Sequence, residues 1–204
     1  MEENNKTINK VDQITGVAQK LFGMYGLEKV SMIEIASELH LSKASLYYYF
    51  PDKESIYKAV LEKEQAEFIN RISDKIRRIN NPEKMLSDYV TMRLEYFSRL
   101  LNLSRLRMEV YSDMKPVFRE VTRLFKEKEM SVVIDIFRLG TERKIFRIDD
   151  IEMTASLFLE LLKGLRVSII TDRRTLIIDK MEYNSLVERT KAFTKIFING
   201  LKYK

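Results

Sequence analysis

The segment from Lys43 to Tyr49 carries side chains that suit contact with a polyanion. Outside its apolar face lie a cation, small residues, a hydroxyl and aromatic rings: Lys43, Ala44, Ser45, Tyr48 and Tyr49. Cationic and hydroxyl groups bind phosphate oxygens, and small or hydrogen-bonding side chains approach the base edges of duplex DNA. The chemistry that these residues predict is recognition of double-stranded DNA by direct contact.

Two short helices are expected to position these residues. Ser31 is a good N-cap, and Glu34 three residues later completes a capping box. Apolar residues then recur at helical spacing as far as Leu39, and Ser42 begins a second helix as another N-cap. The apolar face of this second helix consists of Leu46, Tyr47 and Phe50. Two short helices joined by a tight turn form a helix-turn-helix, whose second helix enters the major groove.

Capping and core packing are the competing interpretations of these residues. For Ser31 and Ser42 we expect capping first, with DNA contact as an added role that is favoured for Ser42. Three successive helical residues point about 100° apart, so Tyr47, Tyr48 and Tyr49 cannot all belong to the core. We expect Tyr47 to be half-buried and the other two tyrosines to be exposed.

The composition predicts an all-α fold and narrows the chemistry. Among 204 residues, the 6 glycines and 3 prolines leave few breaks, which favours long helices. The chain has no cysteine and a single histidine, His40, so thiolate zinc sites and histidine clusters are not expected. We find no nucleophile–base pair and no phosphate-binding loop, so neither an enzyme nor a cofactor is expected. No apolar run is long enough to span a membrane, and the polar start is not a signal peptide, which predicts a cytoplasmic protein.

The charge distribution is uneven along the chain. The formal net charge is +6, but residues 1–60 hold 7 Lys and Arg against 8 Asp and Glu, whereas residues 61–204 hold 29 against 22. Attraction to DNA must therefore come from the local placement of a few lysines, namely Lys6, Lys10, Lys43 and Lys53.

A pass along the chain predicts a small head and a larger helical body. Further helices are expected at 7–25, 52–79, 82–101, 150–171 and 182–202, with shorter helical patterns at 103–113 and 115–139 and a connection at 140–149. Gly26 follows the first of them where a C-terminal cap belongs. We place the boundary within the long helix that starts at Asp52, and assign 1–52 to an N-terminal DNA-binding domain and 53–204 to a C-terminal domain.

The spaced residues in the first quarter of the chain resemble the TetR family of bacterial transcriptional regulators. The resemblance rests on Ala18-x-x-Leu21-Phe22-x-x-x-Gly26, on Ser31-Met32-x-x-Ile35-Ala36, and on Leu41-Ser42-Lys43-Ala44-Ser45-Leu46-Tyr47-x-Tyr49-Phe50-x-x-Lys53-Glu54. Phe146-Arg147-x-Asp149 and Gly164-Leu165 extend it weakly. It implies a three-helix DNA-binding head, a body of roughly six helices for ligand binding and dimerisation, and a two-fold homodimer.

The resemblance also implies roles for single residues. Phosphate contacts are implied for Ser42, Lys43, Tyr49 and Lys53. Approach to base edges is implied for Ala44, Ser45 and Tyr48, and a mixed core and phosphate position for Tyr47. The chain departs from the family pattern where His40 and Ala44 stand in place of a usual glycine and Tyr49 in place of a frequent histidine. Histidine tolerates a left-handed backbone better than most residues.

Methionines and aromatic residues in the body could line a cavity for a small molecule. The candidates are Met85, Tyr89, Met92, Tyr96, Met108, Tyr111, Phe118, Phe158 and Leu162. Ordinary core packing is an equally good interpretation of each. An anionic ligand head could be anchored by Arg93, Arg105, Arg107 or Arg166, although each also fits a paired surface residue.

Two apolar patterns near the C-terminus predict a subunit interface. One consists of Phe158, Leu161, Leu165 and Ile169, with Gly164 permitting close approach; the other consists of Phe193, Ile196 and Phe197. Two helices from each subunit would form a four-helix interface. The alternative is that both faces are buried within one subunit.

The leading functional hypothesis is a homodimeric transcriptional repressor that binds a near-palindromic operator. A small apolar or amphipathic effector would release it by favouring a state in which the heads no longer match the grooves. The alternative is a DNA-bound architectural or protein-interaction factor of the same fold with no small-molecule effector.

Overall fold

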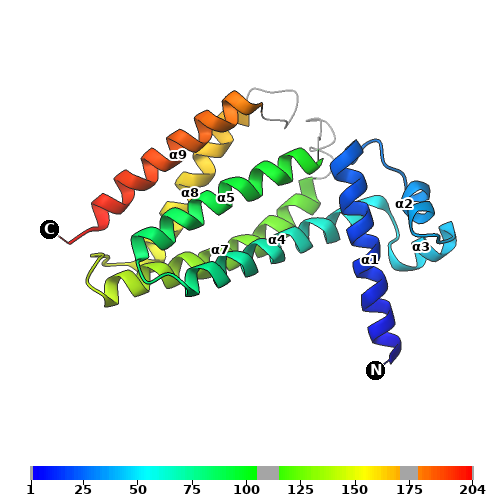
Figure 1. Ribbon diagram of the computed structural model, residues 1–204, viewed down its shortest axis with the longest axis horizontal. Helices are drawn as coiled ribbons and strands as arrows, with labels where there is room; N and C mark the ends of the chain where they lie inside the picture. The colour runs from blue at the N-terminus through cyan, green and yellow to red at the C-terminus, as the bar shows by residue number, and fades with distance from the viewer. Residues whose placement is uncertain (1, 105–114, 171–178, 204) are drawn as a thin grey trace. The chain divides into compact units, whose positions relative to one another are not determined.

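The computed structural model describes residues 2–104, 115–170 and 179–203, with side chains described for 9–98, 116–168 and 179–203. These residues form helices and no β-strand, so the predicted all-α fold is confirmed. The helices are α1 (Glu2–Tyr25), α2 (Met32–Glu38), α3 (Lys43–Tyr49), α4 (Lys53–Arg77), α5 (Pro82–Ser104), α7 (Lys115–Glu142), α8 (Ile151–Ile170) and α9 (Lys180–Leu201) (Figure 1).

The described residues fall into two compact units. The first contains α1, α2 and α3, α4 as far as Gln65, α5 from Arg99, and α7 as far as Val121. The second contains α4 from Ala66, α5 as far as Ser98, α7 from Thr122, and the whole of α8 and α9. α4, α5 and α7 are thus continuous helices that contribute residues to both units.

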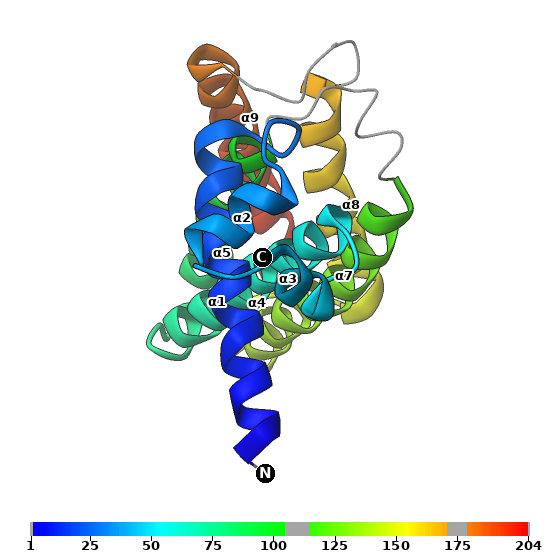
Figure 2. The same ribbon diagram turned by 90° about the vertical axis from the view of Figure 1, so that its right-hand side faces the viewer.

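In the first unit, α1 packs on α2 and α2 on α3 (Figure 2). The core between them is made of fully buried apolar residues, among them Ile14, Phe22, Ile35 and Leu46. The ring of Phe22 meets the edge of Tyr57 on α4 at 5.7 Å between centroids. The first turns of α4 therefore belong to the same core as α1, α2 and α3.

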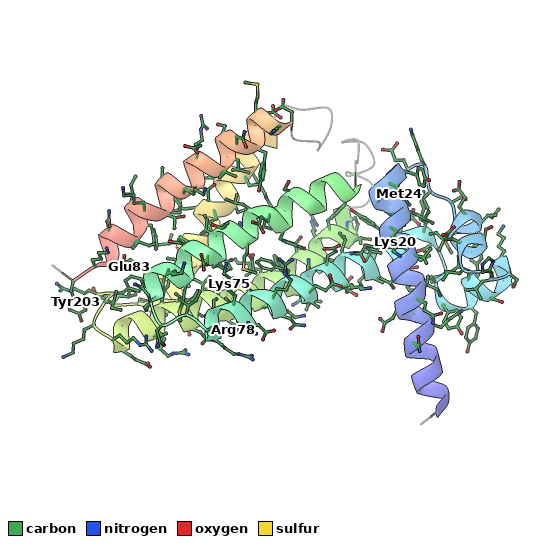
Figure 3. All side chains as sticks on the ribbon, viewed as in Figure 1. Lys20, Met24, Lys75, Arg78, Glu83 and Tyr203 are labelled. Carbon is green, nitrogen blue, oxygen red and sulfur yellow. The ribbon has the colours of Figure 1, made fainter. Side chains whose placement is uncertain are left out.

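The second unit has two clusters of aromatic rings. Phe68, Tyr96 and Phe125 join α4, α5 and α7, with 4.9 Å between the centroids of Phe68 and Tyr96. A second cluster joins α7, α8 and α9 through Phe137, Phe158, Phe193 and Phe197. At the far end of α9, Lys202 pairs with Glu83 at 2.8 Å, and Figure 3 shows Glu83 close to Tyr203.

The helix ends differ from the sequence-based boundaries for identifiable reasons. α7 continues through Glu142, so the prediction that a connection begins at Gly140 was wrong by three residues. Gly140 is a helical residue whose missing Cβ makes room for Phe146, since an added Cβ would lie 2.1 Å from Cδ2 of that ring. α9 begins two residues early because Asp179 and Glu182 form a capping box. Most of the helix predicted at 103–113 falls outside the described residues.

No helix among the described residues is long and apolar enough to cross a bilayer. The same residues contain no group of three or more His, Cys, Asp or Glu side chains arranged to hold a metal ion.

Candidate nucleic-acid interface

Both short helices carry the N-caps that the sequence predicted. The Ser31 hydroxyl accepts from the Glu34 amide at 3.2 Å and donates to the Glu34 carboxylate at 2.8 Å. The Ser42 hydroxyl accepts from the Ser45 amide at 3.0 Å. Hydrogen bonds from the Ser31 backbone and hydroxyl lower the pKa of Glu34. Ser31 is therefore occupied by the cap and lies beside a carboxylate, which disfavours its predicted contact with a phosphate.

The turn between α2 and α3 depends on a left-handed residue. His40 has φ 53°, a conformation that glycine adopts without cost and that most other residues avoid. Gly26, at the end of α1, has φ 84°, and its amide donates to the carbonyl of Phe22 as a C-terminal cap. The two predictions about these backbones are confirmed.

The first turn of α3 presents small polar groups. Lys43 and Ala44 are exposed and Ser45 is half-buried, with its Oγ 2.7 Å from Oγ of Ser42. The ammonium of Lys43 lies 5.6 Å from the centre of the Tyr47 ring. A cation and two hydroxyls thus stand at the N-terminal end of α3, where backbone amides also favour an anion.

The three tyrosines differ in exposure. Tyr48 is 81% exposed and Tyr47 42% exposed, while Tyr49 is half-buried and meets the edge of Tyr48 at 5.1 Å between centroids. The exposure expected for Tyr48 is confirmed, but Tyr47 and Tyr49 exchange the roles expected of them. Leu46 and Phe50 occupy the buried face, and Tyr49 lies closer to that face than Tyr47 does.

Lys53 has a structural contact of its own. Its ammonium donates to the carbonyl of Leu27 at 2.9 Å, which ties the start of α4 to the loop after α1. An ammonium has three donors, so this bond is compatible with the predicted phosphate contact.

The comparisons with known proteins agree with this geometry. Residues 14–60 match the family model described as "Bacterial regulatory proteins, tetR family". A crystal structure of a transcriptional regulator from Cytophaga hutchinsonii ATCC 33406 is 35% identical, with 95% of this chain and 99% of that chain covered and a TM-score of 0.88.

The chain belongs to the TetR family.

As a TetR-family protein it is a DNA-binding transcriptional regulator and not an enzyme, and regulators of this family bind DNA as dimers. It is also similar to the HTH-type transcriptional regulator QacR of Staphylococcus aureus, with 24% identity over 95% of this chain and 99% of that protein. Similarity to the nucleoid occlusion factor SlmA of Haemophilus influenzae is 25% over 67% of this chain and 64% of that protein.

In this TetR-family protein, most residues predicted to line a ligand cavity pack as core. Met85, Tyr89, Met92, Tyr96 and Phe158 are buried. Phe118 is half-buried against Tyr57 in the first unit, with 6.0 Å between ring centroids. Leu162 lines a cavity of about 10 Å³ in the second unit. Met108, Tyr111, Arg105 and Arg107 lie outside the described residues.

A buried polar group in the body was not expected from the sequence. Glu129 on α7 accepts from Nε of Arg93 at 2.6 Å and from the Tyr89 hydroxyl at 2.7 Å. Arg93 is therefore paired, as one interpretation had it, but it is buried rather than at the surface. The helical spacing could have revealed this burial, since Glu129 lies four residues from Phe125 and from Val133. These two residues and Val121 are buried on the same face of α7.

The residues predicted at a subunit interface divide by exposure. Phe158 has no exposed surface, because Phe193 and Phe197 of the same chain cover it. Ile196 is 71% exposed and Leu161 49% exposed. Phe193, Phe197 and Leu165 are half-buried, and the side chain of Ile169 lies outside the described residues. Met153 and Leu157, which were missed, extend the exposed apolar stripe along α8 at four-residue spacing.

Proposed function

We propose that this protein is a homodimeric repressor that a small apolar or amphipathic molecule releases from a near-palindromic operator. The observation that carries the proposal is the double attachment of α4. Its first turns belong to the first unit through Tyr57 and Lys53. A later turn belongs to the second unit through Phe68, whose ring stacks on Tyr96. A displacement of α4 caused in the body would therefore be transmitted to the helices that meet DNA.

In the proposed complex, α3 of each subunit enters the major groove, and the two copies are about 34–36 Å apart along the duplex. Ser42, Lys43, Tyr49 and Lys53 contact phosphates, with Tyr47 at the margin of the contact, while Ser31 caps α2. Ala44, Ser45 and Tyr48 approach base edges. The exposure of Lys43 and Tyr48 supports these assignments. The DNA-binding domain is 1–52, and 53–204 is the domain for ligand binding and dimerisation.

The proposed dimer interface is formed by α8 and α9, which pack on each other within one chain (Figure 1). Their exposed apolar residues, Leu161 and Ile196, support it. Gly164 belongs to the same stripe, and an added Cβ there would meet nothing within 4 Å among the described residues of its own chain. Close approach by a second copy of the chain would explain why a residue without a side chain stands at this position.

The test is specific DNA binding by single variants of the full-length dimer. Tyr48→Ala should lower affinity for the operator far more than for unrelated DNA, because it removes a base contact. Lys43→Ala should weaken binding to all sequences and reduce the slope of log K against log salt by about 1. Lys128→Ala, an exposed lysine of α7, is the matched control and should change neither quantity. Unchanged operator binding by both head variants would contradict the assignment of α3.

The similarity to SlmA favours one second candidate, a DNA-bound architectural or protein-interaction factor without an effector. Genome-wide binding separates the two functions. One or a few near-palindromic sites are expected for a ligand-released repressor, whereas many dispersed sites are expected for the second candidate.

A further inference from the structure

We propose that the effector is an anionic amphipath, and that Arg166 and Thr190 bind its carboxylate or other anionic head group inside the body. This inference rests on the proposed function, in that it names the chemical class of the molecule that releases the repressor. The site lies entirely within the second unit, between α5, α8 and α9. It is lined by Val90, Arg93, Leu94, Phe97, Leu162, Arg166, Leu186 and Thr190.

The polar lining of this site consists of hydrogen-bond donors, two of which are guanidinium cations. The guanidinium carbon of Arg166 lies 3.9 Å from the centre of the Phe97 ring, and that of Arg93 lies 4.6 Å from it. Both guanidinium groups therefore lie beside the same ring of the lining. A guanidinium has five donors, so another acceptor elsewhere does not exhaust it. No acidic residue is among the described residues that line the cavity, so the lining offers donors to an anionic head group and no carboxylate to a cationic one.

Thr190 supplies a donor that is buried and unused. The residue is 2% exposed, and its Oγ1 has no hydrogen-bond partner among the described residues. Its backbone carbonyl is already engaged, since it accepts from the Thr194 hydroxyl at 2.7 Å. A buried hydroxyl without a partner is unfavourable. A ligand oxygen between Arg166 and Thr190 would remove this penalty and give the guanidinium a charge-assisted hydrogen bond.

The rest of the lining suits an apolar tail, because Val90, Leu94, Leu162 and Leu186 surround the polar end. The cavity itself measures about 10 Å³, roughly the space that one water needs. The amphipath therefore binds an arrangement in which α5, α8 and α9 are further apart than in this structure. A difference in affinity between the open and closed arrangements is what a ligand needs in order to shift a conformational equilibrium.

The experiment compares three probes that share one tail and differ in head group: laurate, dodecanol and dodecyltrimethylammonium, each below its micellar concentration. Binding to the full-length protein is measured by calorimetry, and release of a fluorescent operator duplex by anisotropy. We expect laurate to bind at least about tenfold more tightly than dodecanol, because a charge-assisted hydrogen bond is added, and the cation to bind most weakly. Binding of dodecanol or of the cation as tight as that of laurate would overturn the proposal, and so would binding of none of the three.

Two variants test the named residues. Thr190→Val preserves shape and removes only the unpartnered hydroxyl, so the melting temperature should not fall while the Kd for laurate rises about tenfold. Arg166→Gln should weaken laurate binding at least as much, with dodecanol binding unchanged in both variants. Arg138→Gln, an exposed arginine of α7, is the matched control. Arg93 is left intact because its removal would leave the buried carboxylate of Glu129 without its ion-pair partner.

The outcomes separate this inference from the proposed function. Laurate binding that both variants weaken, with the operator still bound, would contradict the ligand-released repressor and leave the anion site standing. Release of the operator by dodecanol, unaffected by either variant, would keep the repressor and overturn the anion site.

Discussion

Nε of Arg93 donates to Oε1 of Glu129 across 2.6 Å, and both side chains are buried between α5 and α7. Burial disfavours the charged form of Arg93, but the carboxylate of Glu129 outweighs this effect, and the pKa of the guanidinium is raised. The guanidinium of Arg93 therefore stays charged although it is buried. The two members of the pair depend on each other, since either charge alone would be buried without compensation.

Removing one member of this pair should be more harmful than removing both. Glu129→Leu should lower the free energy of unfolding by about 3–5 kcal/mol, because Arg93 stays charged and buried. In Arg93→Met/Glu129→Leu most of this loss should be recovered, since two apolar side chains replace two charges. Urea unfolding of the three proteins measures the difference. A double variant less stable than Glu129→Leu would contradict the prediction.

Tyr89 should make the stability of the body depend on pH in the alkaline range. Burial, with the charge of Glu129, raises the pKa of Tyr89 well above its usual value. The folded chain therefore keeps the phenol proton where the unfolded chain loses it, above about pH 10, and wild-type stability falls as the pH rises further. Tyr89→Phe should be about 1.5–3 kcal/mol less stable at pH 8, through loss of a hydrogen bond to a charged group.

The gap between wild type and Tyr89→Phe should then narrow above about pH 10, because the variant has no phenol to titrate. Urea unfolding at a series of pH values from 8 to 11 checks this. A gap that stays constant over the series would show that the two proteins do not differ in proton binding.

The left-handed backbone of His40 predicts an unusual substitution pattern. His40→Gly should leave stability unchanged or raise it by up to about 1 kcal/mol, because relief of strain exceeds the added entropy of the unfolded chain. His40→Val should lower it by about 1–2 kcal/mol. Glu38→Gly, in the last turn of α2, is the matched control and should lower it by about 1 kcal/mol. Thermal unfolding of the wild type and the three variants ranks their stabilities. A His40→Val protein more stable than His40→Gly would contradict this explanation.

Gly140 should resist even the smallest enlargement. An added Cβ would lie 2.1 Å from Cδ2 and 2.7 Å from Cε2 of Phe146, a fully buried ring. Gly140→Ala should therefore lower the free energy of unfolding by about 1–3 kcal/mol, despite the better helix propensity of alanine. Gly200→Ala is the control, since its Cβ would meet nothing within 4 Å among the described residues. Equal effects of the two changes, measured by chemical denaturation, would mean that the contact with Phe146 is not limiting.

Local signals in the sequence were sufficient to predict the helix caps of the head. Ser31 with Glu34, Ser42 and Gly26 each act through neighbours within a few residues, so their caps could be predicted without knowledge of the fold. The periodicity of α3 also predicted which face is buried. It could not order the exposure of Tyr47 and Tyr49, because that depends on how closely α2 and α4 approach the sides of the helix.

In the body the sequence predicted which helix faces are buried, but not which residues pack against them. Met85, Tyr89 and Met92 are buried as their spacing requires, yet spacing alone does not distinguish a filled core from a cavity wall. Glu129 was overlooked because a carboxylate at a core position makes sense only with its partner 36 residues earlier. Gly140 was taken as a helix end because its real constraint, the ring of Phe146, comes from beyond the helix.

The balance of charge in residues 1–60, with 7 cationic and 8 acidic side chains, bears on how the regulator searches the chromosome. Non-specific attachment to duplex arises almost entirely from neutralised phosphates, and this head has few spare cations to supply them. We therefore expect bulk DNA to be a poor competitor for the protein, which would reach specific sites by three-dimensional diffusion more than by sliding. We expect a small number of copies per cell to be enough to keep a specific site occupied.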